Sequence, residues 1–209
     1  MKAYKKQLLI TTLVSLLPMF VGILLWNQLP DRIPIHFDMN GVANGWAGKV
    51  GTVFGMPLFL TASHVLCVIF TLNDPKKQNI GKQMLLIIFW TIPVLNCFCY
   101  GSIYASVLGS SVNTADLVFL FVGLLFVLLG NYMTKNHQNY TVGIRLPWTL
   151  NSPENWNRTH RFASRLWIAA GIVIMLNCFF HFTWLLIAIL VFTTVLPMIY
   201  SFILFKKGI

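Results

Sequence analysis

Charged residues are scarce in this chain of 209 residues. Only 10% of the residues are Asp, Glu, Lys or Arg, whereas 57% are hydrophobic, and the mean hydropathy is +0.73. Soluble globular domains carry about 25% charged residues, so the composition excludes an ordinary soluble domain. The sequence therefore predicts an integral membrane protein.

Cysteine is equally sparse. The four cysteines all lie within predicted membrane spans, at positions Cys67, Cys97, Cys99 and Cys178. Their spacing matches neither a disulfide framework nor a zinc signature. We expect buried free thiols that act as small apolar side chains, and we expect neither a cofactor nor a bound metal.

Carboxylates are nearly absent from the apolar segments. Asp116, at the edge of the fourth predicted span, is the one carboxylate near the membrane. A proton-coupled pump normally has an ionisable residue in the middle of the bilayer, and this chain shows no evident one. His64 and His181 are isolated near or within spans, and we expect each to be a hydrogen-bonded structural histidine.

Long apolar runs, in contrast, fill the chain. A membrane-spanning helix needs about 20 mostly apolar residues, and the first span is too long for a cleaved signal peptide. The expected fold is all-α, a single polytopic membrane domain over 1–209 in which six transmembrane helices form one bundle. The predicted spans are about 7–26, 52–72, 84–108, 115–133, 166–181 and 184–205.

The net charge of +10 follows a pattern along the chain. If the N-terminus lies inside the cell, all of the 15 Lys and Arg residues except Arg32 and Lys49 fall in cytoplasmic segments. The positive-inside rule explains this excess, so direct nucleic-acid binding is not needed to account for it. The sequence predicts a multi-pass plasma-membrane protein with both termini cytoplasmic and one outer loop over 27–51.

That outer loop has the composition of a segment with a defined shape. Its stretch 29–49 contains two prolines, three glycines and a His-x-Asp pair, His36 and Asp38. An extended backbone projects these two side chains from one side, but a metal site needs a third or fourth ligand. We therefore expect a recognition surface, with metal binding at His36 and Asp38 as the minor alternative.

The same loop contains two turn signals. Asp38 or Asn40 is expected to start a turn that Gly41 closes, and Asn44-Gly45 is expected to make a second turn. In that arrangement His36 hydrogen-bonds within the fold, and Trp46 anchors the loop at the membrane interface.

The inner loop, roughly 134–165, is the second patterned region. Its segment 143–150 is expected to be extended or turning, because Pro147 disfavours helical angles at Leu146. A helix then begins at Asn151 or Ser152, with Pro153 in its first turn. One face of this helix carries aromatic and small residues, and the opposite face carries arginines; the two sets are Trp156, His160, Ala163 and Trp167, and Arg158, Arg161 and Arg165.

Two interpretations of this amphipathic helix stay open. Its arginines bind lipid phosphates while the helix lies at the headgroup level, or the same surface docks a cytoplasmic protein.

A third polar feature is the face of the third span that carries Asn96 and Tyr100, which we expect to point into the bundle, with Asn177 as a potential partner.

The two loops together resemble one family. "LPDRIPIHFDMNGVANGWAGK" and "GIRLPWTLNSPENWNRTHRFASRLW" are similar to the outer and inner patterns of the SdpI-type bacterial immunity proteins. The residues that match are His36, Asp38, Gly45 and Trp46 in the outer pattern, and Arg145, Pro147, Trp148, Trp156, His160 and Arg161 in the inner one. The sequence departs from the pattern at Leu146, Pro153 and Ala163-Ser164.

The resemblance implies a dual, non-enzymatic role. A family member protects its cell from a secreted toxic peptide, and it also signals by holding a small cytoplasmic autorepressor at the membrane. By this analogy the toxin binds the outer loop and the repressor contacts the inner one; the residues implied are His36, Asp38, Asn40, Gly41, Gly45 and Trp46 outside, and Arg145, Pro147, Trp148, Trp156, Arg158, His160 and Arg161 inside.

Two alternatives remain at this stage. One is a membrane enzyme or small transporter that acts on a lipid or another anionic substrate through His36, Asp38, His160 and the arginines. The other is a structural subunit of a larger membrane complex.

Overall fold

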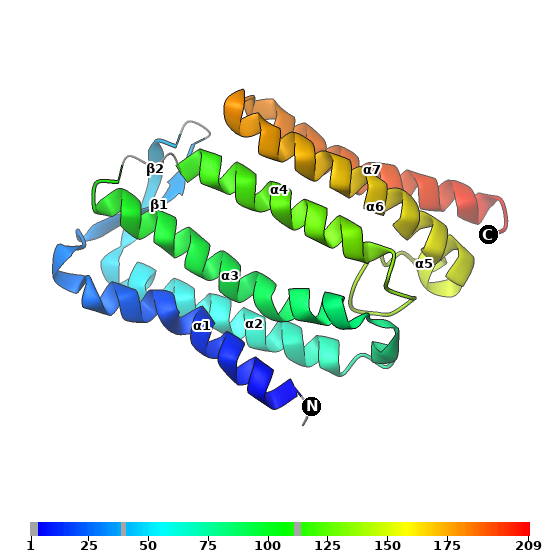
Figure 1. Ribbon diagram of the computed structural model, residues 1–209, viewed down its shortest axis with the longest axis horizontal. Coiled ribbons are helices and arrows are strands. Elements are labelled where there is room, and N and C mark those ends of the chain that lie inside the picture. The colour runs from blue at the N-terminus through cyan, green and yellow to red at the C-terminus, as the bar shows by residue number, and fades with distance from the viewer. Residues whose placement is uncertain (1–3, 39–40, 111–113) are drawn as a thin grey trace. The chain divides into compact units, whose positions relative to one another are not determined.

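The fold is that of an all-α polytopic membrane protein, as the sequence predicts. A computed structural model describes residues 4–38, 41–110 and 114–209 (Figure 1). Within these residues six helices are long and apolar enough to cross a membrane. They are α1 (Lys5–Leu24), α2 (Met56–Leu72), α3 (Lys82–Val107), α4 (Thr114–Met133), α6 (Pro153–Leu176) and α7 (Thr183–Lys206).

The chain forms two compact units. Unit 1 comprises Met1–Leu72 and Leu86–Ala115, and unit 2 comprises Asn73–Leu85 and Asp116–Ile209. Unit 1 therefore holds α1, α2 and most of α3, while unit 2 holds most of α4, together with α6, α7 and the short helix α5 (Pro147–Asn151).

Polar side chains join the three helices of unit 1. Ser15 on α1 accepts a hydrogen bond from Thr61 of α2 at 2.9 Å, and its carbonyl accepts one from Asn96 of α3 at 2.7 Å. His64 pairs with Thr11 at 2.9 Å and is fully buried. Such interhelical bonds stabilise helix packing in an apolar solvent. The expected partner of Asn96, Asn177, instead hydrogen-bonds Phe182.

Pro18 inside α1 is accommodated by α3. Proline lacks a backbone N–H, so the carbonyl of Val14 receives no bond from its own helix at that position. The thiol of Cys97 donates to this carbonyl at 3.3 Å, and the hydroxyl of Tyr104 donates to the carbonyl of Pro18 at 3.1 Å. A neighbouring helix thus satisfies the carbonyl that Pro18 leaves without an intrahelical donor, which is how membrane helices tolerate internal prolines.

The strands that the structure describes both lie in the connection between α1 and α2. After the 3₁₀ turn Trp26–Gln28, β1 (Arg32–Phe37) and β2 (Ala43–Gly48) pair as an antiparallel hairpin. The register breaks on either side of His36, so that His36 lies opposite Gly45. A π-helical turn, Gly51–Gly55, then leads into α2.

Close backbone contact joins α4 to α6 in unit 2. A β-carbon at Gly171 would lie 2.5 Å from the carbonyl oxygen of Gly123, and one at Gly130 would lie 3.0 Å from that of Ser164. Small residues at such positions let membrane helices approach closely. α6 also packs along α7, and Figure 1 shows these two helices side by side.

Candidate functional site

Two surfaces contain the residues that the sequence singles out, one in each unit. The first is the hairpin β1–β2, which is anchored by the side chain of Ile33. Ile33 is fully buried and packs with Leu29, Val53, Tyr100, Ile103 and Tyr104. Burial of a side chain of this size contributes about 1.5–3 kcal/mol, so the hairpin is an ordered part of unit 1.

Lys49 fastens the second end of the hairpin. Its ammonium group donates to the carbonyl of Leu29 at 2.8 Å and lies 4.6 Å from the ring centroid of Trp26. The backbone N–H of Lys49 also donates to the carbonyl of Asp31 at 2.9 Å. One of the two cations expected outside the cell therefore has structural partners for both its ammonium group and its backbone N–H.

Asp38 starts the turn at the tip of the hairpin, as predicted. Its carboxylate accepts from the N–H of Val42 at 2.9 Å, and its carbonyl accepts from the N–H of Gly41 at 3.0 Å. Gly41 has φ of 79°, a value that glycine adopts at little cost. Asn40, the other expected turn residue, lies outside the described residues.

The second predicted turn, at Asn44-Gly45, is wrong. Both residues lie inside β2, and the Asn44 side-chain oxygen hydrogen-bonds Nδ1 of His36 across the hairpin. A β-carbon at Gly45 would lie 2.9 Å from the β-carbon of His36, so the absence of a side chain there lets the strands pair. Turn propensity at Asn-Gly is thus overridden by cross-strand pairing.

The hairpin exposes polar and apolar side chains next to one another. His36 is exposed and hydrogen-bonds Asn44, and Asp38 caps the turn. No three His, Cys, Asp or Glu side chains in the described part of the chain gather in a way that would hold a metal ion. Exposed side chains of Val42 (61%) and Trp46 (55%) leave apolar surface beside these polar groups.

The second surface is built from two connecting segments of unit 2, the α2–α3 connection and the inner loop. Asp74 in the first segment is buried beneath the second. Its carboxylate accepts from three donors: Lys76 N–H at 2.7 Å, Tyr140 N–H at 2.9 Å and the Thr141 hydroxyl at 2.5 Å. Hydrogen bonds to a charged acceptor are stronger than neutral ones, so Asp74 holds the inner loop in place.

Amide side chains complete this attachment. Gln138 accepts from the Lys76 ammonium at 2.8 Å and donates to the carbonyl of Leu150 at 2.7 Å. Asn136 accepts from the N–H of Gly81 at 3.0 Å, and Asn139 accepts from the N–H groups of Thr141 and Val142. The inner loop is therefore ordered by side chains that sequence patterning did not single out.

Trp156 and His160 lie under the loop instead of facing solvent. Trp156 is fully buried and donates from its indole nitrogen to the carbonyl of Asn136 at 3.0 Å. The ring of His160 stacks on it, with centroids 4.0 Å apart, and its Nε2 accepts from the N–H of Ile144 at 2.9 Å. Nδ1 of His160 donates to the carbonyl of Trp156 at 2.7 Å, so both ring nitrogens are engaged.

The segment expected to be extended or turning contains one helical turn. Pro147 begins α5, and the Thr149 hydroxyl accepts from the N–H of Leu146 and donates back to the carbonyls of Ile144 and Leu146. Pro147 disfavours helix only at the residue before it, so a turn that starts at the proline itself is compatible with its geometry. Ser152 then caps α6 by accepting from the N–H of Asn155 at 3.1 Å, as predicted.

The two opposed faces of α6 are present as predicted. Trp156, His160 and Ala163 are buried, and the arginine side chains are exposed at Arg158, Arg161 and Arg165. Arg158 pairs with Glu154 at 2.5 Å, and Arg145 donates to the carbonyl of Tyr140 at 2.7 Å. The exposed part of the inner surface is therefore cationic, and its aromatic residues support it from below.

Sequence reasoning missed Asp74, Asn136, Gln138 and Asn139. A weak signal for Asp74 exists, because an acidic residue among the lysines of a short connection needs a partner. The amides lie in the polar stretch 135–140 and carry no spacing signal, since their partners are up to 62 residues away in the chain.

Two family models match parts of the chain that contain the hairpin and most of the inner loop. Residues 135–201 match the model of the SdpI/YfhL protein family, and residues 13–61 match a domain of unknown function (DUF1648). The chain is 26% identical over 205 residues to immunity protein SdpI of Bacillus subtilis (strain 168), with 97% of each chain covered. No solved structure matches the chain.

Proposed function

This chain belongs to the SdpI/YfhL protein family, and on that premise we propose that it is an immunity protein of the plasma membrane, with both termini cytoplasmic. It protects the bacterial cell that carries it from a secreted toxic peptide. The observation that carries the proposal is the full-length match to a protein named for immunity, combined with an ordered, exposed hairpin between the first two spans.

The hairpin captures the toxin in this proposal. Its rigid attachment through Ile33 lowers the entropy lost on binding, and preorganised surfaces bind more tightly for that reason. Trp46 and Val42 supply apolar contact area, and the His36–Asn44 pair supplies hydrogen-bonding groups beside it. A surface of mixed apolar and polar character suits an apolar or cationic peptide, because aromatic side chains dominate many binding hot spots.

A protection assay tests the capture role. The chain and its variants are expressed in a toxin-sensitive host, and survival is measured against the concentration of the cognate peptide. We expect Trp46→Ala and His36→Ala to abolish protection. Trp184→Ala is the matched control, because Trp184 is also exposed, at 77%, but lies on α7 in unit 2.

Two outcomes contradict this proposal. Unchanged killing of cells that carry correctly inserted wild-type chain would remove the immunity role. Full protection by Trp46→Ala, with loss of protection by Trp184→Ala, would move the capture surface away from the hairpin.

Signalling forms the second part of the proposal. The cationic inner surface around Arg145, Arg158 and Arg161 contacts a small cytoplasmic autorepressor, and toxin binding shifts the population of the state that exposes this surface. Trp156 and His160 act from beneath, since they are buried and hold Asn136 and Ile144. Pro147 and Trp148 lie on α5 next to this surface.

A reporter assay separates signalling from protection. We expect Arg161→Gln and Arg145→Gln to keep protection and to lose toxin-dependent induction of a reporter that the repressor controls. Lys6→Gln, an exposed cation on α1, serves as the control and should induce normally. Normal induction in both arginine variants would exclude this surface as the repressor contact.

The arrangement of His160 argues against the enzymatic alternative. Both of its ring nitrogens are occupied by backbone partners, and the lone pair that a general base would use, on Nε2, accepts the N–H of Ile144. We therefore propose a non-catalytic role in which the inner histidine is structural.

A further inference from the structure

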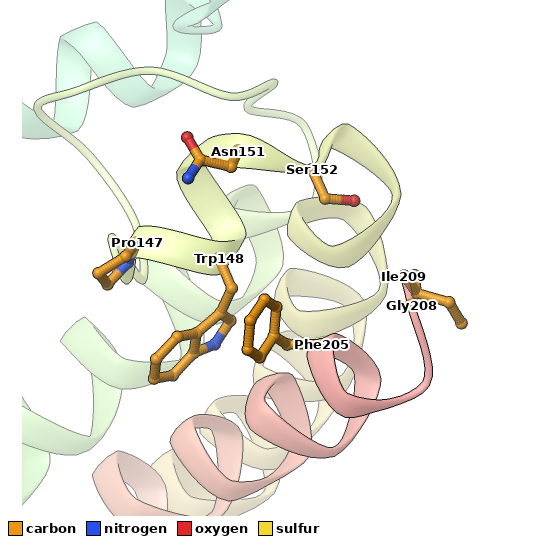
Figure 2. A pocket seen from close by; sticks show the side chains of 7 residues that line it. All are labelled: Pro147, Trp148, Asn151, Ser152, Phe205, Gly208 and Ile209. Atoms are coloured by element: carbon orange, nitrogen blue, oxygen red, sulfur yellow. The ribbon is translucent and has the colours of Figure 1, made fainter.

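A pocket of about 380 Å³ lies where α5 meets the end of α7, both within unit 2 (Figure 2). Pro147, Trp148, Asn151 and Ser152 line it from α5 and its junction with α6. Phe205 and Ile209 line it from the end of α7. The functions proposed above assign no ligand to this pocket, although Pro147 and Trp148 lie next to the surface proposed for the repressor.

The apolar wall of the pocket is held in position. Trp148 stacks on Phe205 with ring centroids 5.8 Å apart, and it meets Phe202 edge-on at 5.4 Å. Its indole nitrogen donates to the hydroxyl of Ser201 at 2.9 Å, which fixes the ring against α7. Figure 2 shows the indole and the phenyl ring facing each other.

Positive charge adjoins this wall. Lys206 and Lys207 directly follow Phe205, and both are exposed. The ammonium of Lys206 lies 5.5 Å from the ring centroid of Phe202, on the side of α7 that carries the aromatic residues. The described lining contains no acidic side chain, and the carbonyl oxygen of Ile209 is taken up by the amide of Asn155 at 3.1 Å.

The length of α7 indicates the level at which the pocket lies relative to the membrane. Its 24 residues span about 36 Å at 1.5 Å per residue, whereas the hydrocarbon core of a bilayer is about 30 Å thick. Each end of α7 therefore reaches the headgroup region, with exposed Trp184 near one end and Lys206 at the other. A pocket lined by Phe205 and Ile209 opens at the level of phospholipid headgroups.

We propose that this pocket binds one anionic phospholipid. The lipid phosphate lies against Lys206 and Lys207, where a basic site beside membrane helices attracts anionic headgroups. The glycerol and the first acyl carbons lie on the indole of Trp148 and the ring of Phe205, because aromatic rings favour the membrane interface. The amide of Asn151 provides a hydrogen-bonding group at the rim.

Native mass spectrometry of the full chain in detergent micelles tests the site. Phosphatidylglycerol is titrated, and the retained lipid is counted. We expect one saturable molecule in the wild type and at least about tenfold weaker binding when Lys206→Gln and Lys207→Gln are combined, since each cation near a membrane surface contributes to anion attraction. Phosphatidylcholine, which has no net charge, should bind at least about tenfold more weakly than phosphatidylglycerol.

Lys5→Gln combined with Lys6→Gln is the matched control. These two exposed, adjacent lysines also lie at the end of a membrane-spanning helix, and we expect their removal to leave saturable binding unchanged. Phe205→Ala tests the apolar wall without altering charge, and it should weaken binding while the thermal unfolding of the protein stays close to that of the wild type.

Three outcomes overturn the proposal. Equal loss of lipid in the two double variants would mean a general response to basic helix ends. Equal retention of phosphatidylcholine and phosphatidylglycerol would exclude an anion site. Retention of an acidic helical peptide by the wild type, with no saturable phosphatidylglycerol, would assign the pocket to a protein partner.

Discussion

Gly143 lies directly against the imidazole of His160. A β-carbon at Gly143 would overlap Nε2 of that ring, and the same nitrogen accepts the backbone N–H of Ile144, the residue that follows Gly143. Gly143 has φ of 122°, a region that residues with a side chain seldom adopt. The glycine of the inner pattern is therefore required both by its backbone angle and by its contact with His160.

Gly143→Ala should destabilise unit 2 by about 2–4 kcal/mol, because it combines backbone strain with a steric overlap. Thermal unfolding in detergent measures the effect. Gly109→Ala is the control for strain alone, since Gly109 has φ of 84° and a β-carbon there would meet nothing within 4 Å. Equal effects of the two substitutions would show that the contact with His160 contributes nothing.

Asp74→Asn should loosen the inner loop. The amide keeps one acceptor oxygen but loses the charge that three donors share, at a cost of about 1.5–3 kcal/mol. Hydrogen exchange at the N–H groups of Tyr140 and Thr141 is expected to accelerate. Asp31→Asn, at an exposed aspartate of unit 1, should leave these amides unchanged, and unaltered exchange in Asp74→Asn would remove Asp74 as the attachment point.

Ile33→Ala should release the hairpin from unit 1. Truncation of a fully buried isoleucine costs about 2–5 kcal/mol, and the loss falls on the local unit that the side chain anchors. Exchange at the N–H of Val42 should accelerate, and protection against the toxin should weaken. Ile35→Ala is the comparison, because Ile35 is only half-buried and its truncation should cost less. A larger effect of Ile35→Ala would contradict the assigned anchor.

Gly171→Ala should separate α4 from α6. The added methyl group would lie 2.5 Å from the carbonyl oxygen of Gly123, a backbone atom that cannot move aside without displacing its helix. We expect destabilisation of about 1–3 kcal/mol. Gly101→Ala in α3, where a β-carbon meets nothing within 4 Å, should be neutral or stabilising because alanine favours helix. A neutral Gly171→Ala would show that the two helices are not in close contact.

The loops show where sequence reasoning succeeds. The turn at Asp38 and the helix start at Ser152 depend on side chains that bond their own neighbours, over four and three residues. The two faces of α6 follow from helical periodicity alone. These features are local, so the residue types and their order are sufficient to predict them.

The failures have the opposite cause. Asn44-Gly45 has the chemistry of a turn but lies in β2, because a glycine opposite His36 lets the two strands pair. The resemblance assigns Trp156 and His160 to the inner surface, and only the structure shows that they lie beneath the loop and hold it. Local chemistry does not reveal which groups the rest of the chain covers.

The amino-acid sequence by itself determined that this is a membrane protein with six helices and two patterned loops, because apolar length and turn chemistry are properties of short segments. Only the tertiary structure decided that Asp74 holds a loop 66 residues further along the chain. It also decided that the hydrogen bond expected for His36 within the fold is made with Asn44. Such contacts join residues that are far apart in the chain. The cost of closing the loop between them depends mainly on its length, so the order of its residues does not reveal which distant segments meet.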